Sequence, residues 1–202
     1  MRQLGLIAII FIGAAWTEGL TRKPAVDLLS KAFVAKTFDV KVEEIFSNSL
    51  NRETVLFSWP KPNAEAIRKR NKEILAKRGN VRVPPKDGEK PEVLIRDRAI
   101  VHLSYSVQES AEIAERIIQE AFSKDSEILG KVNHGRVEKY RVNYDIPLKD
   151  LGDHAAWSTS HRQLTLRQGA VIFHLNVDVA ESPEPDGAQA KIIMAEVLDN
   201  LQ

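Results

Sequence analysis

Hydrophobic and polar residues alternate over residues 93–107, and this period of two predicts β-strand. The residues of one parity are apolar, and those of the other are mostly basic or small and polar. This pattern is typical of a strand with one face on a core and one face in water. Asp97 interrupts the apolar set, so we expect a bend there or a break between two strands. The apolar positions are Val93, Ile95, Ala99, Val101, Leu103, Tyr105 and Val107.

A second alternating region predicts a β-hairpin. The runs 163–166 and 171–179 flank Gly169, which can supply the positive φ that a tight turn needs. We expect one parity of both runs to be buried beneath the helices that contain Ile117 and Val197. The residues expected on that face are Leu164, Leu166, Val171, Phe173, Leu175 and Val177, and those expected to point away are His174, Asn176 and Asp178.

Apolar residues at helical spacing predict four amphipathic helices between the strands. Ser106 and Glu109 have the spacing of a capping box and are expected to open the third helix. The helices are expected over 25–40, from Asn63 to Arg78 with Gly79 ending it, from the capping box to Phe122, and over 188–201. Further strands are expected over 54–59 and 137–146 and polar loops over 80–91 and 181–187, while 41–50 is ambiguous.

These elements predict an α+β fold, a mostly antiparallel β-sheet with amphipathic helices packed on one side. A βαβ arrangement was the alternative, but strands of a buried parallel sheet are apolar on both faces. Here one face carries Arg, His, Asn and Asp. We therefore expect an α/β sandwich, formed by one domain over residues 16–202.

The first residues have the pattern of a secretory signal peptide. Arg2 gives a short basic start, residues 4–15 are apolar or small, and Gly13 and Ala15 suit cleavage before Trp16. The run is shorter than the roughly 20 apolar residues of a transmembrane helix. We therefore expect residues 1–15 to be removed, leaving a periplasmic or secreted protein without an integral membrane segment. An uncleaved anchor and a buried N-terminal element of a cytosolic protein are the alternatives.

Composition narrows the possible functions. The chain has 202 residues, 43% of them hydrophobic and 28% charged, which is globular composition. A net charge of +1 favours neither nucleic acid nor an anionic membrane, so no nucleic-acid partner is expected. The absence of cysteine excludes disulfides, thiolate metal sites and cysteine nucleophiles, and no cofactor is expected.

One third of the chain carries a family resemblance. The segment 151–157 reads Leu-Gly-Asp-His-Ala-Ala-Trp, and 163–169 reads Gln-Leu-Thr-Leu-Arg-Gln-Gly before an alternating strand and a C-terminal helix. This order resembles uncharacterised bacterial exported proteins with a "GD-A-W" segment and an "L-V-R-G" hairpin, and it is similar to periplasmic or lumenal domains of the PsbP-like α/β sandwich type. The strand 57–59 also resembles their "Y-W" strand, although Gln168 departs from the hairpin pattern.

The resemblance implies export and a sandwich fold, without implying a catalytic activity. It also implies structural roles for the matched residues. Gly152 and Gly169 would lie in turns, Trp157 in the core or at its rim, and Asp153 would hydrogen-bond a turn backbone.

The second predicted helix is unusually basic. Its candidate partner-binding residues are Arg68, Lys69, Arg70 and Lys72, four cations within five positions. They could contact an anionic partner protein or envelope component. The alternative is a solvated helix stabilised by i,i+4 ion pairs such as Glu65–Lys69.

Three histidines near the C-terminus are the candidates for chemistry. His154, His161 and His174 could bind a divalent metal, and Ser158 or Ser160 beside His161 could serve a hydrolase. No metal-binding or nucleophile-elbow motif accompanies them, so we expect ordinary surface histidines. The sequence therefore favours a non-enzymatic exported protein that binds a protein or envelope component, with a metal-binding protein or hydrolase as the alternative.

Overall fold

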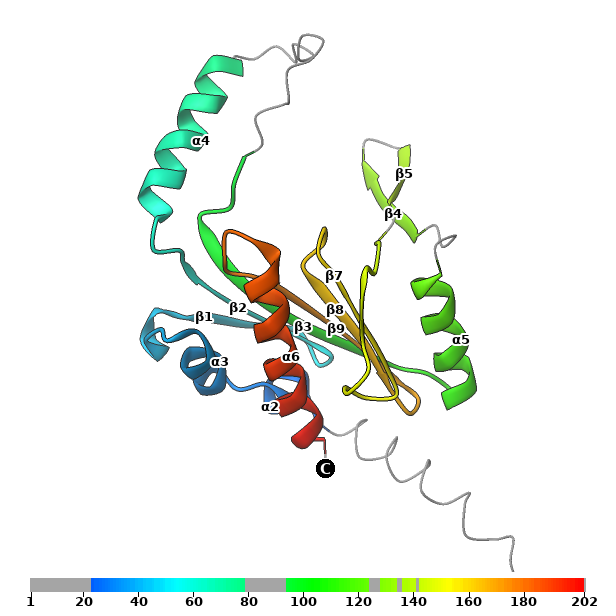
Figure 1. Ribbon diagram of the computed structural model, residues 1–202. Helices are drawn as coiled ribbons and strands as arrows, with labels where there is room; N and C mark the ends of the chain where they lie inside the picture. Colours follow the sequence, from blue (N-terminus) through cyan, green and yellow to red (C-terminus); the bar gives the residue numbers. More distant parts are fainter. Residues whose placement is uncertain (1–22, 79–93, 124–127, 134–135, 141, 202) are drawn as a thin grey trace, which may run out of the picture.

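A seven-stranded antiparallel sheet organises the computed structural model, which describes residues 23–78, 94–123, 128–133, 136–140 and 142–201 (Figure 1). Its order is β1-β2-β3-β9-β8-β7-β6, and every neighbouring pair is antiparallel. The predicted α+β sandwich is confirmed. The strands are β1 (Phe46–Asn51), β2 (Thr54–Pro60), β3 (Arg98–Val107), β6 (Ile146–Leu148), β7 (His154–Ser158), β8 (Gln163–Gln168) and β9 (Val171–Asp178). A separate hairpin pairs β4 (Ile128–Asn133) with β5 (Arg136–Tyr140).

The main core lies between one face of this sheet and three helices. These are α2 (Ala25–Leu28), α3 (Lys31–Phe38) and α6 (Pro183–Asp199). The predicted strand parity is confirmed, because all six hairpin residues expected inside are buried in this core. Register matches apolar partners across the sheet, with Leu103 opposite Leu175 and Tyr105 opposite Phe173. We refer to this side as the core face and to the other side as the open face.

Helix α5 (Ala111–Phe122) packs on the open face, so the prediction of helices on one side only is wrong. Its Ala114 and Ile118 are buried against Ile172 of β9. Ile117, expected to cover the core face, is 38% exposed. The spacing of apolar residues in α5 correctly predicts its buried stripe. The helix covers the open face because its partner, Ile172, belongs to the other parity of β9, which also carries His174 and Asn176.

Several predicted boundaries need correction. The single helix expected over 25–40 is split into α2 and α3, because Ser30 caps a new helix by accepting the backbone N–H of Phe33. The N-cap of α5 is Ser110, which accepts from Ile113, so the Ser106–Glu109 capping box is wrong. β3 begins at Arg98, directly after the residue where a break was expected.

The expected loop 181–187 is helical from Pro183, and the expected strand 137–146 is divided between β5 and β6 of different sheets. Proline is tolerated in the first helical turn because the N–H that it lacks would have no helical partner there. The ambiguous segment 41–50 forms a 3-10 turn, η1 (Val42–Glu44), and edge strand β1. The predicted loop 80–91 lies outside the described residues, as does the predicted signal peptide 1–15.

The structural roles implied for the segment 151–169 are observed. Gly152 and Gly169 have φ of 61° and 58°. Trp157 is buried in the main core, and Asp153 Oδ2 accepts the backbone N–H of Gly169 at 2.8 Å. This hydrogen bond joins the residue before β7 to the β8–β9 turn.

Helix α4 (Ala64–Arg78) extends away from the end of the sheet (Figure 1). Ala64, Ile67 and Ile74 are buried, whereas Leu75 is exposed, so residues 64–76 present only a narrow apolar stripe to the rest of the protein. Among the described residues, we find no helix with the length and apolar character to cross a membrane.

Candidate anion-binding groove

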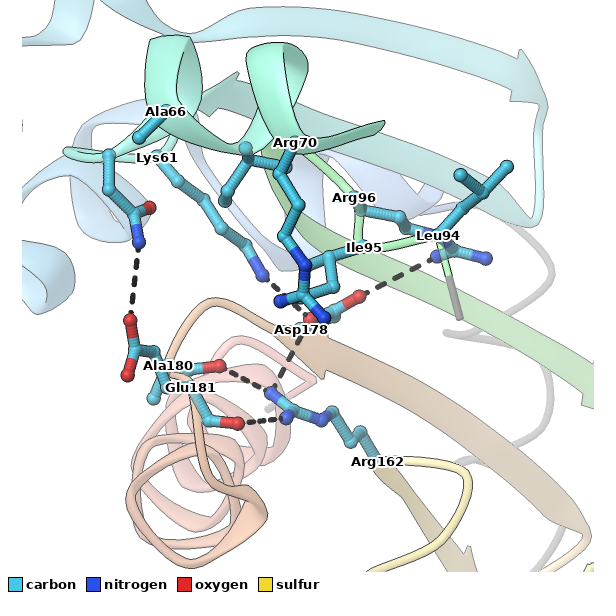
Figure 2. Close-up of a pocket in the computed structure, with 12 residues that line it drawn as sticks. Lys61, Ala66, Arg70, Leu94, Ile95, Arg96, Arg162, Asp178, Ala180 and Glu181 are labelled. Atoms are coloured by element: carbon cyan, nitrogen blue, oxygen red, sulfur yellow. Dashed lines mark hydrogen bonds and ion pairs between the residues drawn. The ribbon is translucent and has the colours of Figure 1, made fainter. Parts of the chain in front are cut away.

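Asp178, the last residue of β9, lies close to three cationic side chains from separate segments of the chain. Its carboxylate lies 3.0 Å from Lys61 Nζ, 3.4 Å from Arg162 Nη1 and 3.8 Å from Arg96 Nη1. Lys61 follows β2, Arg96 precedes β3, and Arg162 lies in the β7–β8 turn. The antiparallel pairing of β2, β3 and β9 brings these ends together at one edge of the sheet (Figure 2).

Arg162 is held by the loop that leads into α6. It donates to the carbonyl oxygens of Ala180 at 2.6 Å and Glu181 at 2.7 Å, and to Asp186 Oδ2 at 2.6 Å. The backbone has a φ of 50° at Arg162, a left-handed conformation that is costly for a non-glycine residue. The side-chain contacts supply a reason for this conformation, because they fix the guanidinium at the sheet edge.

Asp186 fixes both the Arg162 side chain and the loop that follows β9. The carboxylate is 1% exposed and accepts the backbone N–H groups of Val179 and Ala180 while it pairs with Arg162. A buried carboxylate needs such partners to offset its lost hydration. The loop at the end of β9 is therefore fixed by backbone and charge contacts together.

A groove of about 670 Å³ runs between α4 and this edge. Ala66, Ile67 and Arg70 line it from α4, and Leu94, Ile95 and Arg96 line it from the segment before β3. Figure 2 shows Arg70 extending from α4 toward Asp178 and the segment that carries Arg96. We call this space the groove.

The structure separates the four residues that the sequence singled out. Arg68 Nε pairs with Asp97, and this ion pair lowers the pKa of the Asp97 carboxyl. Asn71 exchanges two hydrogen bonds with the backbone of Ile95, so this face of α4 is tied to the segment before β3. Of the four cations, Arg70 lines the groove, whereas Lys69 and Lys72 are exposed and do not line it.

A second hollow, of about 750 Å³, lies on the open face and shares Arg96, Arg162 and Asp178 with the groove. We call it the sheet cavity. Its wall is apolar at Leu50, Leu56, Ile100 and Val142, and polar at His102, Ser160, His161, Gln163 and Asn176.

A polar network lies beside the sheet cavity on the open face. Thr165 Oγ1 lies 2.8 Å from His174 Nδ1 and 2.7 Å from the Tyr144 hydroxyl, and Gln163 Nε2 donates to both Tyr144 and Thr165. His174 is thus not the surface histidine that was expected. Burial, with a smaller effect from nearby His102, lowers the pKa of His174 below its usual value.

The surroundings of His102 also disfavour its protonated form. Burial lowers the pKa of its imidazole, and the Asn176 side chain partly offsets this effect. The Nε2 atom of His102 is buried and has no hydrogen-bond partner among the described residues. Sequence reasoning missed His102, because on an alternating strand it had the pattern of a solvated polar residue.

The three predicted histidines do not converge on one site. His154 lies at the far end of β7, where its Nδ1 is 3.0 Å from Glu115 of α5. His161 lies in the β7–β8 turn, and His174 belongs to the network on β9. In the part of the chain that the structure describes, no three histidine, cysteine or acidic side chains form a group that could hold a metal ion.

Ser158, Ser160 and His161 do lie together, but within one turn. Ser160 Oγ is 2.9 Å and Ser158 Oγ 3.4 Å from the same atom, His161 Nδ1, and Ser158 also accepts from the backbone N–H of His161. Hydroxyl contacts within three residues are typical of turn geometry. The turn positions Arg162 at the groove, and this is its clearest role.

The charge run on α4 was the sequence signal for an anionic contact, but most of the groove comes from elsewhere. Lys61, Arg96, Arg162 and Asp178 are far apart in the chain and form no linear motif. The arrangement can bind a carboxylate or phosphate, because several donors converge at one place. Comparisons with family models, curated proteins and solved structures found no match for this chain.

Proposed function

We propose that the protein is a non-enzymatic binding protein that works outside the cytoplasm. Its groove binds a carboxylate or phosphate group of a protein or envelope partner. The observation that carries this proposal is the gathering of Lys61, Arg96 and Arg162 around the single carboxylate of Asp178, with Arg70 facing them from α4.

The charges in the groove favour an anionic ligand. Four lining residues are cations, Lys61, Arg70, Arg96 and Arg162, and two are acids, Asp178 and Glu181, so the lining has a formal charge of +2. Lys61 and Arg162 are already engaged with Asp178 and Asp186. Arg96 is 67% exposed and 3.8 Å from Asp178, which leaves donors of its guanidinium facing solvent.

A binding role accounts for the groove better than the metal or hydrolase alternatives. The serines near His161 contact it through a local turn, within three residues of the chain, and such hydroxyl contacts are typical of turn geometry. The three histidines lie at different places on the sheet. The cations, by contrast, converge from four segments, which is the arrangement expected of a site for an acidic group.

Export is proposed on the apolar run 4–15 and its small-residue end, together with the resemblance to exported α/β sandwich proteins. A groove on the outside of the domain suits a partner met in the periplasm or in the envelope. Export and groove binding are independent parts of the proposal, and each has its own test.

The groove is tested by the change in melting temperature on adding inorganic phosphate at constant ionic strength. Ligand that binds only the folded protein raises the melting temperature. We expect a concentration-dependent rise that is lost in the double variant Arg70→Gln, Arg96→Gln. The matched control, Lys69→Gln with Lys72→Gln, removes the same charge from exposed positions outside the groove and should keep the rise. An equal response of both double variants would contradict the proposal.

A further inference from the structure

We propose that the sheet cavity binds the apolar chain of a monomeric anionic amphiphile whose acidic head group lies at Arg96. This inference rests on the proposed function, because the head group would occupy the cationic groove. It identifies the ligand class as a small carboxylate or phosphate that carries an alkyl or acyl chain.

The two hollows adjoin at their charged ends. Arg96, Arg162 and Asp178 line both, so an anion at Arg96 lies at the mouth of the sheet cavity as well as in the groove. A ligand whose charged end lies at Arg96 can extend over the open face and remain in contact with the residues that line the sheet cavity.

The floor of the sheet cavity is apolar over three adjacent strands. Leu50 of β1, Leu56 of β2 and Ile100 of β3 lie on the open face. At the usual spacing between strands, these three strands together span about 10 Å. Leu50 is 58% exposed, whereas Val142 is buried at the wall. Apolar side chains that line a hollow gain free energy when a chain covers them.

The Nε2 atom of His102, which has no hydrogen-bond partner in the described part of the chain, is a second indication of a ligand. A buried polar atom without a partner costs free energy, and structures usually satisfy such atoms with protein, water or ligand. His102 lines the sheet cavity together with Asn176.

The size of the cavity favours a small molecule. Its volume of about 750 Å³ is within the range of roughly 300–1,000 Å³ that is usual for ligand sites. A membrane surface would instead need apolar side chains that protrude together from the protein. The combination of a hollow, an apolar floor and cations at one end therefore indicates a single amphiphile.

The inference is tested by calorimetric titration with decanoate, held well below the concentration at which it forms micelles. Butyrate serves as the short-chain comparison and inorganic phosphate as the probe of the head-group site alone. Each methylene buried in the cavity should increase affinity about fourfold. We expect decanoate to bind at least a hundredfold more tightly than butyrate, with one molecule per protein.

Two variants locate the chain and the head group. The double variant Leu50→Ser, Ile100→Thr should weaken decanoate binding at least tenfold and leave the response to phosphate unchanged. Arg96→Gln should weaken both. The control Ile192→Ser changes an exposed residue of α6 outside both hollows and should alter neither. Melting temperatures confirm that each variant is folded.

The outcomes separate the inference from the proposed function. Arginine-dependent phosphate binding without a gain from chain length would overturn the amphiphile and keep the proposed function. The inference would also be overturned if decanoate bound the Arg96→Gln variant as tightly as the parent. The same holds if the protein sedimented with phosphatidylglycerol vesicles but showed no saturable binding of decanoate. If substitution of Arg70 and Arg96 changes the affinity for neither phosphate nor decanoate, the proposed function is contradicted as well.

Discussion

Phe173 and His174 are neighbours on β9 whose side chains lie on opposite faces of the sheet. Phe173 is fully buried on the core face, with its ring 5.9 Å from Tyr105. His174 contacts Thr165 on the open face. The two positions therefore separate the contribution of packing from that of the polar network.

We expect Phe173→Ala to lower the free energy of unfolding by about 3–5 kcal/mol, since truncating a buried Phe removes apolar contact and leaves a cavity. His174→Ala should cost about 1–2 kcal/mol, because Thr165 keeps its contacts with Tyr144 and Gln163. Chemical denaturation of both variants measures the difference. Equal losses would show that the network stabilises the fold as much as the core does.

Two half-buried histidines, His102 and His174, make stability depend on pH. Burial lowers the pKa of both His102 and His174, so the folded protein binds fewer protons than the unfolded chain. Their contribution is present above the usual pKa of 6.5 and is lost as pH falls below it. We expect the melting temperature to decrease between pH 7.5 and pH 5.5, before the surface carboxylates protonate.

The variant His102→Phe is the control for this pH dependence. It removes one titrating group together with the Nε2 atom, which is without a hydrogen-bond partner among the residues that the structure describes. Its stability at pH 7.5 should therefore remain within about 1 kcal/mol of the parent. The decrease toward pH 5.5 should be smaller than in the parent. An unchanged pH profile would mean that other groups cause the decrease.

At the scale of elements, two turn glycines share a positive φ but differ in their surroundings. A Cβ added at Gly152 would lie 2.8 Å from the carbonyl oxygen of Arg167 and 2.9 Å from Leu166, whereas one added at Gly169 would meet nothing within 4 Å. Gly152 adjoins β7, and Gly169 lies between β8 and β9.

Gly169→Ala should therefore cost about 1–2 kcal/mol, the usual penalty of left-handed backbone for an L-residue. Gly152→Ala should cost more, because the new Cβ must also displace backbone. Denaturation curves of the two variants test the order. A larger loss at Gly169 would contradict the packing around the segment 151–157.

Element type could be predicted where apolar residues alternated or recurred at helical spacing without interruption, as in β3, β9 and α5. β7 was missed because His154 to Ser158 contains two alanines and one aromatic residue and has no β-branched side chain. It is a strand because Trp157 is buried and β6 and β8 pair with it on both sides. The start of α6 could not be predicted from its two prolines, because proline is typical of polar loops as well as of the first helical turn.

The groove could be predicted only in small part, because its residues meet through the topology of the sheet. The charge run on α4 indicated an anionic contact, and of its four cations Arg70 lines the groove. Arg162 reaches the groove through a left-handed turn and a buried carboxylate 24 residues later, Asp186. No local pattern in the sequence describes such a contact.

At the scale of the whole molecule, the proposal of export rests on the first residues of the chain, which have the pattern of a signal peptide. We expect the mature protein in its native host to begin near Trp16, because Gly13 and Ala15 suit a signal peptidase. Mass spectrometry of the protein from separated cell fractions measures this directly. Full-length protein beginning at Met1 in the cytosolic fraction would contradict export.

The central claim is that cations from separate segments form one binding site at the edge of the sheet. Mapping backbone amide NMR shifts during titration with inorganic phosphate at constant ionic strength tests it most directly. The account predicts saturable shifts concentrated at Arg96, Arg162 and residues 178–181, and small shifts near His154 and Glu115. Shifts spread evenly over basic residues, or concentrated at the His154 end of the sheet, would contradict it.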